Sequence, residues 1–216
     1  MAKIIFVTGG CRSGKSSFAQ KYAEEIDNDG NDGNEGNEKS NEQRKIYLAT
    51  APIIKGDLEM QERINQHKKN RSAKLWETIE EELDLKKIFF RYQNQNKNQN
   101  KNQNKNQYQK QQVIILVECL TLWVNNLIYH NPKLQEEELL KIANDMLEPL
   151  SNLESNHNNS NSCVIFVSNE LGMGIVPENS LSRKYRDFVG RINQLIAKNA
   201  HEVYFLVSGI SIKIKG

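Results

Sequence analysis

The sequence has no long apolar run and no excess of charge of one sign, and its first residues are not those expected of a secretory leader. No stretch of about 18 consecutive apolar residues occurs, which argues against a membrane-spanning helix. The apolar part of the N-terminus is too short for a signal peptide. The 216 residues carry a formal net charge of +2, which provides no broad electrostatic field for nucleic acid or a membrane surface. We therefore expect a cytoplasmic protein with no nucleic-acid partner and no membrane span.

Cysteine is scarce, and its spacing matches no metal or disulfide motif. The three cysteines, Cys11, Cys119 and Cys163, are an odd number and form no C-x-x-C pair. Disulfide frameworks and structural zinc sites need paired or closely spaced cysteines, so neither is expected. We predict three buried free thiols in a reducing compartment.

Three polar tracts contain almost no apolar side chains. Asn-rich sequence fills residues 27–43, 93–107 and 152–162. Such segments bury too little apolar surface to offset the conformational entropy that is lost on ordering. We interpret them as flexible surface insertions, rather than interaction tails, in a single domain that spans residues 1–216.

The sequence between the tracts alternates between two apolar patterns. Short, nearly continuous runs rich in Ile and Val are typical of strands that are buried on both faces of a parallel sheet. Longer stretches with apolar residues three and four apart indicate amphipathic helices. Together they predict an α/β sandwich with right-handed crossovers, in which residues 208–216 turn back as an antiparallel edge. The expected strands are 3–9, 45–50, 113–120, 163–170 and 202–210, and the expected helices are 16–26, 58–69, 120–129, 136–150 and 182–200.

The strongest chemical signal is the segment GGCRSGKS, which matches the phosphate-binding pattern G-x-x-x-x-G-K-[ST]. It follows an expected strand and opens an expected helix, as a phosphate-binding loop requires. Glycines allow the loop N–H groups to face phosphate oxygens, and Lys15 can reach the β- and γ-phosphates. The motif predicts a mostly parallel, three-layer P-loop NTPase fold of the RecA-like type. Its candidate nucleotide-binding residues are Gly9, Gly10, Cys11, Arg12, Ser13, Gly14, Lys15 and Ser16.

An acidic residue completes the expected nucleotide site. Glu118 follows five apolar residues at the end of a strand, where its carboxylate would face Lys15 and Ser16. We expect Ser16 and Glu118 to hold Mg²⁺; the alternative is that Glu118 is a strand-end carboxylate with no ligand. Glu170 ends another strand in the same way, with or without a functional role. Arg12 either clamps a phosphate or points to solvent.

Several separate segments, in a fixed order, resemble one known family. They are TGGCRSGKS, IYLATA, RINQHKKNR followed by Trp76, LVECLTLWVNNL, SNELGMGIVPENSLSRKYRDFVGRINQLIA and VYFLVSGISIKIK. Together they resemble the bifunctional adenosylcobinamide kinase/adenosylcobinamide-phosphate guanylyltransferase family of cobalamin biosynthesis. The resemblance covers nearly all of the chain outside the Asn-rich tracts.

The resemblance implies two reactions on one corrinoid substrate. The family phosphorylates the aminopropanol hydroxyl of adenosylcobinamide with ATP or GTP, then transfers GMP from GTP to that phosphate and releases pyrophosphate. The transfer proceeds through a GMP–histidine intermediate, and the histidine of the family's R-I-x-x-H motif falls here on His67, preceded by Arg63. A homotrimer is also implied. Residues 172–183 are expected to line the corrinoid or nucleotide pocket, or else to form an ordinary surface loop.

The chemistry of guanylyl transfer suits a histidine at this position. A neutral imidazole is nucleophilic near pH 7, and positive neighbours would stabilise the phosphoryl oxygens. Arg63, Lys68 and Arg71 either supply that charge or form a solvated basic face. The chain departs from the family after the histidine, because Arg71 precedes Ser72 where the family often has Arg-Pro. The remaining histidines, which lack such neighbours and are expected to be structural or solvent-facing, are His130, His157 and His201.

Two other functions remain compatible with the same phosphate-binding loop. A monofunctional small-molecule kinase would use Lys15, Ser16 and Glu118 and would leave His67 without a role. A regulatory protein would bind nucleotide without any transfer chemistry. The products formed from GTP and adenosylcobinamide would distinguish these alternatives.

Overall fold

The protein is built from alternating strands and helices. The computed structural model describes residues 2–28, 44–51, 62, 76–98, 113–151 and 162–216. In chain order the elements are β1 (Lys3–Gly9), α1 (Lys15–Asn28), β2 (Arg44–Ala49), β3 (Trp76–Glu80), α3 (Leu85–Asn98), β4 (Val113–Glu118), α4 (Leu120–His130), α5 (Glu136–Ser151), β5 (Cys163–Asn169), α6 (Ser180–Asn199), β6 (Glu202–Val207) and β7 (Ile210–Lys215).

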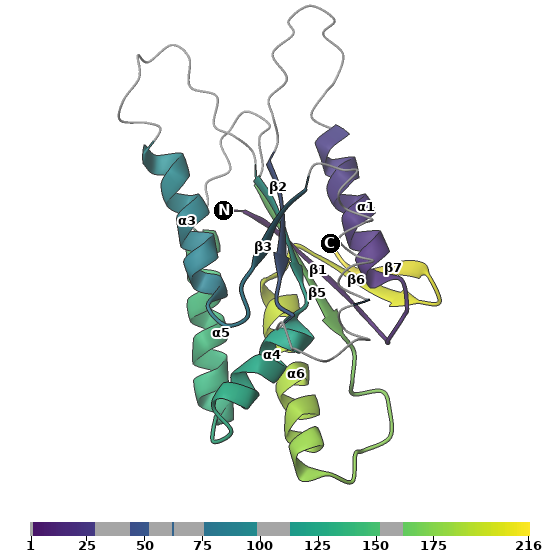
Figure 1. Cartoon of the computed structure of the whole chain (residues 1–216). Coiled ribbons are helices and arrows are strands. Elements are labelled where there is room, and N and C mark those ends of the chain that lie inside the picture. Colours follow the sequence, from purple (N-terminus) through teal and green to yellow (C-terminus); the bar gives the residue numbers. More distant parts are fainter. Residues whose placement is uncertain (1, 29–43, 52–61, 63–75, 99–112, 152–161) are drawn as a thin grey trace, which may run out of the picture.

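A seven-stranded sheet lies at the centre, with helices on both sides (Figure 1). The strand order is β3-β2-β4-β5-β1-β6-β7. All neighbouring strands from β3 to β6 pair in parallel, and β7 pairs antiparallel with β6. The mostly parallel sheet and the antiparallel C-terminal edge are therefore confirmed. The parallel register also places the carboxyl ends of β1, β2, β4 and β5 along one edge of the sheet.

Alternate residues of the parallel strands face opposite sides of the sheet. Along β1, Ile4 and Phe6 join a large apolar cluster, whereas Ile5 and Val7 join a smaller one. The large cluster also contains side chains from α3, α4, α5 and α6, and the smaller one contains Ala19 from α1. The predicted three layers are thus confirmed, with burial of both strand faces explaining the continuous apolar runs.

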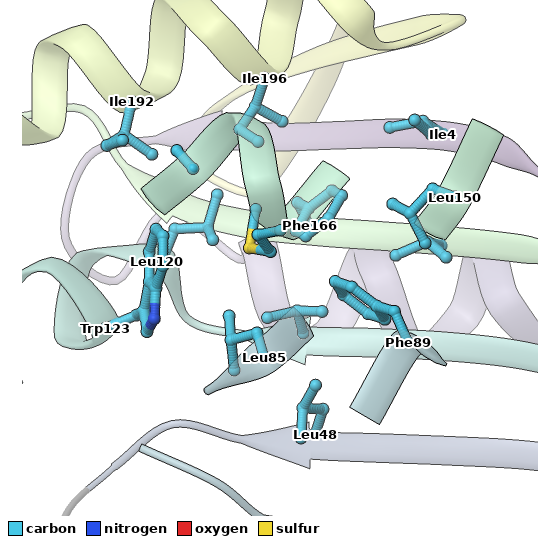
Figure 2. Close-up of a cluster of buried hydrophobic side chains, with 14 of the residues drawn as sticks. Ile4, Leu48, Leu85, Phe89, Leu120, Trp123, Leu150, Phe166, Ile192 and Ile196 are labelled. Carbon is cyan, nitrogen blue, oxygen red and sulfur yellow. The ribbon is translucent and has the colours of Figure 1, made fainter. Parts of the chain in front are cut away.

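Figure 2 shows the larger cluster between the sheet and its helices. Phe166 of β5 meets Phe89 of α3 edge to face, with ring centroids 6.0 Å apart. Trp123 of α4 is 1% exposed, and its indole N–H donates to the carbonyl oxygen of Leu83 at 2.9 Å. Full burial of a Leu or Phe side chain contributes about 1.5–3 kcal/mol. This cluster therefore attaches the helices to the sheet.

Helices α5 and α6 begin where the sequence supplies suitable end groups. The first turn of α5 carries Glu136, Glu137 and Glu138, whose negative charges favour a helix N-terminus. Asn179 precedes α6, and its side chain accepts a hydrogen bond from the Ser182 N–H at 3.1 Å.

Within the described ranges, no helix is long and apolar enough to cross a membrane. The predicted apolar face of α6 is confirmed by buried Phe188, Val189, Ile192 and Ile196, with Tyr185 partly buried beside them.

Two elements lie where the sequence pattern predicts neither strand nor helix. Strand β3 is a short sheet edge whose residues are half-buried or exposed, so it lacks a continuous apolar run. Helix α3 begins with apolar residues but continues through residues 93–98, which belong to the second Asn-rich tract. Gln93 is buried. Packing of the first part of this helix overrides the weak pattern of its polar end.

The boundaries predicted for the polar tracts are corrected by the ordered residues at their ends. Residues 27–28 belong to α1, residues 93–98 belong to α3, and Ser162 is buried and accepts a hydrogen bond from the Lys3 N–H at 2.9 Å. The helix predicted over 58–69 lies outside the described residues, apart from Glu62. The interpretation of the remaining tract residues as insertions stays a prediction.

Each polar tract joins the end of a helix to the beginning of a parallel strand. Residues 29–43 connect α1 with β2, residues 99–112 connect α3 with β4, and residues 152–161 connect α5 with β5. The stretch between Ala51 and Trp76 instead follows the carboxyl end of β2. Its first residue is therefore attached at the edge where β1 and β4 also end.

Glu202, at the start of β6, connects several elements through its carboxylate. It accepts hydrogen bonds from Tyr22 of α1 at 2.7 Å and Tyr204 at 2.6 Å. Lys3 of β1 lies 2.7 Å away and Lys213 of β7 lies 3.5 Å away. Burial raises the pKa of Glu202, but the hydrogen bonds from Lys3, Tyr204 and Tyr22 outweigh it and lower the pKa to about 2. The charged carboxylate therefore stabilises the packing of α1 against β6.

Replacement of this carboxylate should produce a pH-dependent loss of stability. Glu202→Gln should lower the free energy of unfolding by about 1–2 kcal/mol at neutral pH, because the amide loses charge-assisted hydrogen bonds. The folded pKa lies below the ordinary value of 4.5, so the carboxylate stabilises the fold fully above pH 4.5 and loses this effect as the pH falls through about 2. Urea unfolding of both proteins across this range checks the prediction.

The matched control for Glu202 is Glu25→Gln, because Glu25 is 59% exposed in a surface pair with Lys21. The control should change the free energy of unfolding by less than about 0.5 kcal/mol. A stability difference between wild type and Glu202→Gln that stays constant down to low pH would contradict the assignment.

Candidate active site

Strand β1 leads directly into a tight loop that precedes α1. Gly9 and Gly14 have φ angles of 153° and 93°, which side-chain-bearing residues rarely adopt. A Cβ atom on Gly9 would lie 2.3 Å from the carbonyl oxygen of Leu206. The glycines of the phosphate-binding motif are therefore required by backbone conformation and by close approach of β6.

The loop is held from two sides by neighbouring parts of the sheet. The N–H of Glu170, just beyond β5, donates to the carbonyl oxygen of Gly9 at 2.9 Å. The N–H of Gly209, in the turn between β6 and β7, donates to the carbonyl oxygen of Ser13 at 2.9 Å. These bonds position the loop before any ligand binds, which reduces the ordering cost of binding.

Lys15 is the first residue of α1 and is almost completely buried. Its side chain is 7% exposed, and its ammonium group donates to the carbonyl oxygen of Gly10 at 2.6 Å. Burial lowers the pKa of Lys15, while Cys119, Cys11 and Glu118 act in the opposite direction. A phosphate in this loop would pair with the ammonium group and favour its charged form.

Ser16 and Glu118 meet across the sheet edge. The Ser16 hydroxyl donates to Oε1 of Glu118, although the two residues are 102 positions apart in the chain. The second carboxylate oxygen, Oε2, is buried and has no hydrogen-bond partner within the described part of the chain. A hydroxyl and a carboxylate are oxygen ligands of the kind that Mg²⁺ prefers. The pair fits a divalent cation that also contacts a bound phosphate.

The remaining residues of the loop differ in their exposure. Cys11 is exposed, which corrects the expectation of three buried thiols. Cys163 is buried, and burial raises the pKa of its thiol to about 12. Arg12 is exposed at a φ of 54°, so its guanidinium is free to reach a ligand or solvent. The Ser13 hydroxyl is buried without a partner among the described residues.

Other predicted residues lie outside this cluster or outside the described ranges. Glu170 accepts a hydrogen bond from the N–H of Gly172 within its own turn. His201 accepts a hydrogen bond from the Ile4 N–H at 2.9 Å, which is a structural role. His130 is the last residue of α4; it is half-exposed and lies near Glu82, which precedes α3. Five further predicted residues lie outside the described residues: Arg63, His67, Lys68, Arg71 and His157.

The structure also reveals a polar junction beside Glu118 that sequence patterns did not identify. Thr50 follows β2 and is fully buried, and Asn126 of α4 is 3% exposed. The Asn126 amide donates to the carbonyl oxygens of Thr50 at 2.8 Å and Glu82 at 3.1 Å. In the sequence, Thr50 and Asn126 lie in IYLATA and LVECLTLWVNNL, two of the segments that carry the family resemblance, and Thr50 is a polar residue that directly follows the apolar strand KIYLA. Such a residue is also common at strand ends with no function.

The arrangement can bind a polyphosphate together with a cation. A helix N-terminus and its N–H groups attract phosphate, the buried Lys15 adds a full positive charge, and Ser16 with Glu118 provides oxygen ligands. These groups come from the carboxyl ends of β1 and β4, which is where open α/β sheets bind ligands.

Two neighbouring glycines of the loop should respond differently to substitution. Gly9→Ala should lower the free energy of unfolding by at least about 2 kcal/mol, because the new methyl group meets the Leu206 carbonyl and the φ angle is unfavourable. Gly10→Ala is the matched control, since no atom lies within 4 Å of its added Cβ. Thermal unfolding should show a melting temperature about 4 °C or more lower for Gly9→Ala. Equal melting temperatures for the two variants would contradict this interpretation.

Comparison with known proteins agrees with the geometry. A family model described as cobinamide kinase/cobinamide phosphate guanyltransferase matches residues 5–214. The chain is 34% identical over 215 residues to the bifunctional adenosylcobalamin biosynthesis protein CobU of Escherichia coli, covering 98% of this chain and 99% of that protein. It is also 34% identical over 217 residues to the CobU protein of Salmonella typhimurium, with coverage of 98% and 99%.

A third relative comes from a different genus. The bifunctional adenosylcobalamin biosynthesis protein CobP of Pseudomonas aeruginosa is 33% identical over 211 residues, covering 97% of this chain and 96% of that protein. The resemblance inferred from the sequence motifs is thereby confirmed. The chain belongs to the cobinamide kinase/cobinamide phosphate guanyltransferase family.

Proposed function

We propose that this chain phosphorylates adenosylcobinamide with ATP or GTP and then transfers GMP from GTP to the new phosphate. The products are adenosylcobinamide-GDP and pyrophosphate. Family membership over residues 5–214 supports both reactions. The observation that carries the kinase reaction is the contact between the Ser16 hydroxyl and Glu118, beside the buried Lys15.

In the first reaction, the loop binds the nucleotide through its phosphates. The N–H groups at the start of α1 and the Lys15 ammonium stabilise negative charge on the β- and γ-phosphates. The substrate hydroxyl oxygen attacks the γ-phosphorus, and the bond from that phosphorus to the bridging oxygen breaks. The hydroxyl proton passes to solvent, and the nucleoside diphosphate leaves. Positioning and electrostatic stabilisation account for the rate of such a transfer.

Ser16 and Glu118 are the residues that we propose hold Mg²⁺ with the nucleotide. When held there, the cation would supply positive charge to offset the negative charge of the nucleotide phosphates. The buried, unpartnered Oε2 atom of Glu118 supports this assignment. Within the described ranges, no group of three or more His, Cys, Asp or Glu side chains could hold a metal. Mg²⁺ needs no such group, because it retains water and phosphate ligands.

In the second reaction, His67 is the proposed guanylyl acceptor. A neutral nitrogen of its imidazole attacks the α-phosphorus of GTP, a P–N bond forms and pyrophosphate leaves. An oxygen of the cobinamide phosphate then attacks the same phosphorus, and the P–N bond breaks to regenerate the imidazole. The R-I-x-x-H motif supports this role, with Arg63 as a further phosphate-binding residue. The stretch that contains His67 is also attached to the carboxyl end of β2, at the edge where Glu118 lies.

A homotrimer in the cytoplasm is the proposed form of the enzyme, with no nucleic-acid partner. Two apolar surfaces on the same chain support an assembly with unlike faces in contact, and such contacts form a closed ring when three copies are related by a threefold rotation. One surface lies in the loop between β5 and α6 and in the first turn of α6, and the other lies on β7. Their exposed side chains are Met173, Ile175 and Val176 in the loop, Leu181 in α6, and Ile210, Ile212 and Ile214 on the strand.

The reaction products test the proposed function directly. The full-length protein is incubated with GTP, Mg²⁺ and adenosylcobinamide, and the corrinoid and phosphate products are separated. The bifunctional enzyme should form adenosylcobinamide-GDP and pyrophosphate. Phosphocobinamide alone would indicate a monofunctional kinase, and neither product would indicate a regulatory nucleotide-binding protein.

The two reactions should separate in a His67→Ala variant. GTP labelled at the α-phosphate should leave a protein-bound label that acid removes and alkali does not, as expected for a phosphoramidate. His67→Ala should abolish this label and the second reaction but retain phosphorylation of cobinamide, which needs no covalent nucleophile.

Lys15→Ala should reduce both reactions by orders of magnitude, because both nucleotides lose the same phosphate-binding charge.

The control for this experiment is His130→Ala, because His130 is half-exposed and lies on α4. It should retain both reactions and the bound label. Undiminished labelling of the His67→Ala protein would show that another residue accepts the guanylyl group.

A further inference from the structure

Thr50 uses its backbone N–H and its hydroxyl group to hold the end of β4. Its N–H donates to the carbonyl oxygen of Glu118 at 3.1 Å, which extends the β2–β4 pairing by one residue. Its hydroxyl accepts a hydrogen bond from the Cys119 N–H at 2.7 Å and donates to the Cys119 carbonyl oxygen at 2.8 Å. A single residue therefore binds both polar groups of the Glu118–Cys119 peptide and the carbonyl group of Cys119.

Asn126 holds Thr50 from the opposite direction. One amide nitrogen donates both to the Thr50 carbonyl oxygen and to the Glu82 carbonyl oxygen, at 2.8 Å and 3.1 Å. Thr50 is fully buried and Asn126 is 3% exposed, so water does not compete for these bonds. Buried hydrogen bonds of this kind are costly to break, because the separated groups lose their partners.

We propose that Thr50 is a positioning residue for the carboxylate of Glu118, and that Asn126 supports it. Thr50 does not contact the Glu118 carboxylate itself. It fixes the Glu118 carbonyl group and the backbone of Cys119 that follows, and this positions the Glu118 side chain where it meets Ser16. The inference rests on the proposed nucleotide site. It extends that site, because it makes Thr50, the residue after β2, responsible for the orientation of the proposed metal-binding carboxylate of Glu118.

The expected effect is on the contribution of Mg²⁺ to nucleotide binding. The phosphate-binding loop connects β1 to α1, and Lys15 is the first residue of α1. Neither the loop nor Lys15 is hydrogen-bonded to Thr50. Loss of the Thr50 hydroxyl should therefore leave metal-free nucleotide binding unchanged. It should weaken the additional affinity that Mg²⁺ provides, because this depends on the direction of the Glu118 carboxylate.

Calorimetric titration of the full-length protein with a non-hydrolysable ATP analogue tests this inference. The dissociation constant is measured with and without Mg²⁺, and the ratio of the two gives the tightening due to the cation. Thr50→Val should reduce this ratio about tenfold and change metal-free binding by less than about twofold. Thr50→Ser, which retains the hydroxyl, should behave as the wild type does.

Asn126→Leu provides a second variant that leaves Thr50, Glu118 and Cys119 unchanged. It should reduce the Mg²⁺-dependent ratio in the same direction, and it replaces Thr50→Val in the test if that protein does not fold. An unchanged ratio in the folded variants would overturn the inference, and so would an equal loss of affinity with and without Mg²⁺, which indicates a purely structural role. A wild type that binds the analogue equally well with and without Mg²⁺ would instead contradict the proposed metal site itself.

Discussion

Parallel hydrogen bonding between β1, β5 and β4 is the constraint on which the site depends. β5 lies between the other two strands, and its register aligns Val7 with Val167 and Val167 with Glu118. This alignment brings the loop after β1 to the same height as the carboxylate at the end of β4. Ser16 and Glu118 therefore meet although 102 positions separate them in the chain. Burial of both sheet faces keeps the register, because a shift by one residue would move each side chain to the opposite face of the sheet, where it would no longer fit its apolar cluster.

The central part of this architecture could be predicted from the sequence. Strands buried on both faces leave continuous Ile- and Val-rich runs, and the loop glycines are required by backbone conformation. Glu118 was identified because it directly follows such a run. Each of these features depends on neighbours in the sequence, so a single chain contains the necessary information. The family motifs added His67 and Arg63, whose roles remain predictions.

Features that depend on distant contacts could not be predicted in the same way. β3 is a sheet edge with little burial, and the end of α3 has the composition of a polar tract. Cys11 is exposed because the loop projects at the sheet edge, whereas cysteines are usually buried. The hydrogen bonds between Thr50 and Cys119 join residues 69 positions apart and follow no periodic pattern. Such pairs become visible only when the strands are placed side by side.

The attachment points of the polar tracts divide the sheet into two functionally different rims. All three tracts enter β2, β4 and β5 at their amino ends, while the phosphate-binding loop, Glu118 and Thr50 lie at the carboxyl ends. A strand of six or seven residues separates the two rims by about 20 Å. A whole strand therefore separates each tract from the candidate phosphate-binding groups. The direction of the parallel strands places added polar sequence and candidate chemistry at opposite ends of the same strands, so residues inserted before a strand begins need not shift the groups at its far end.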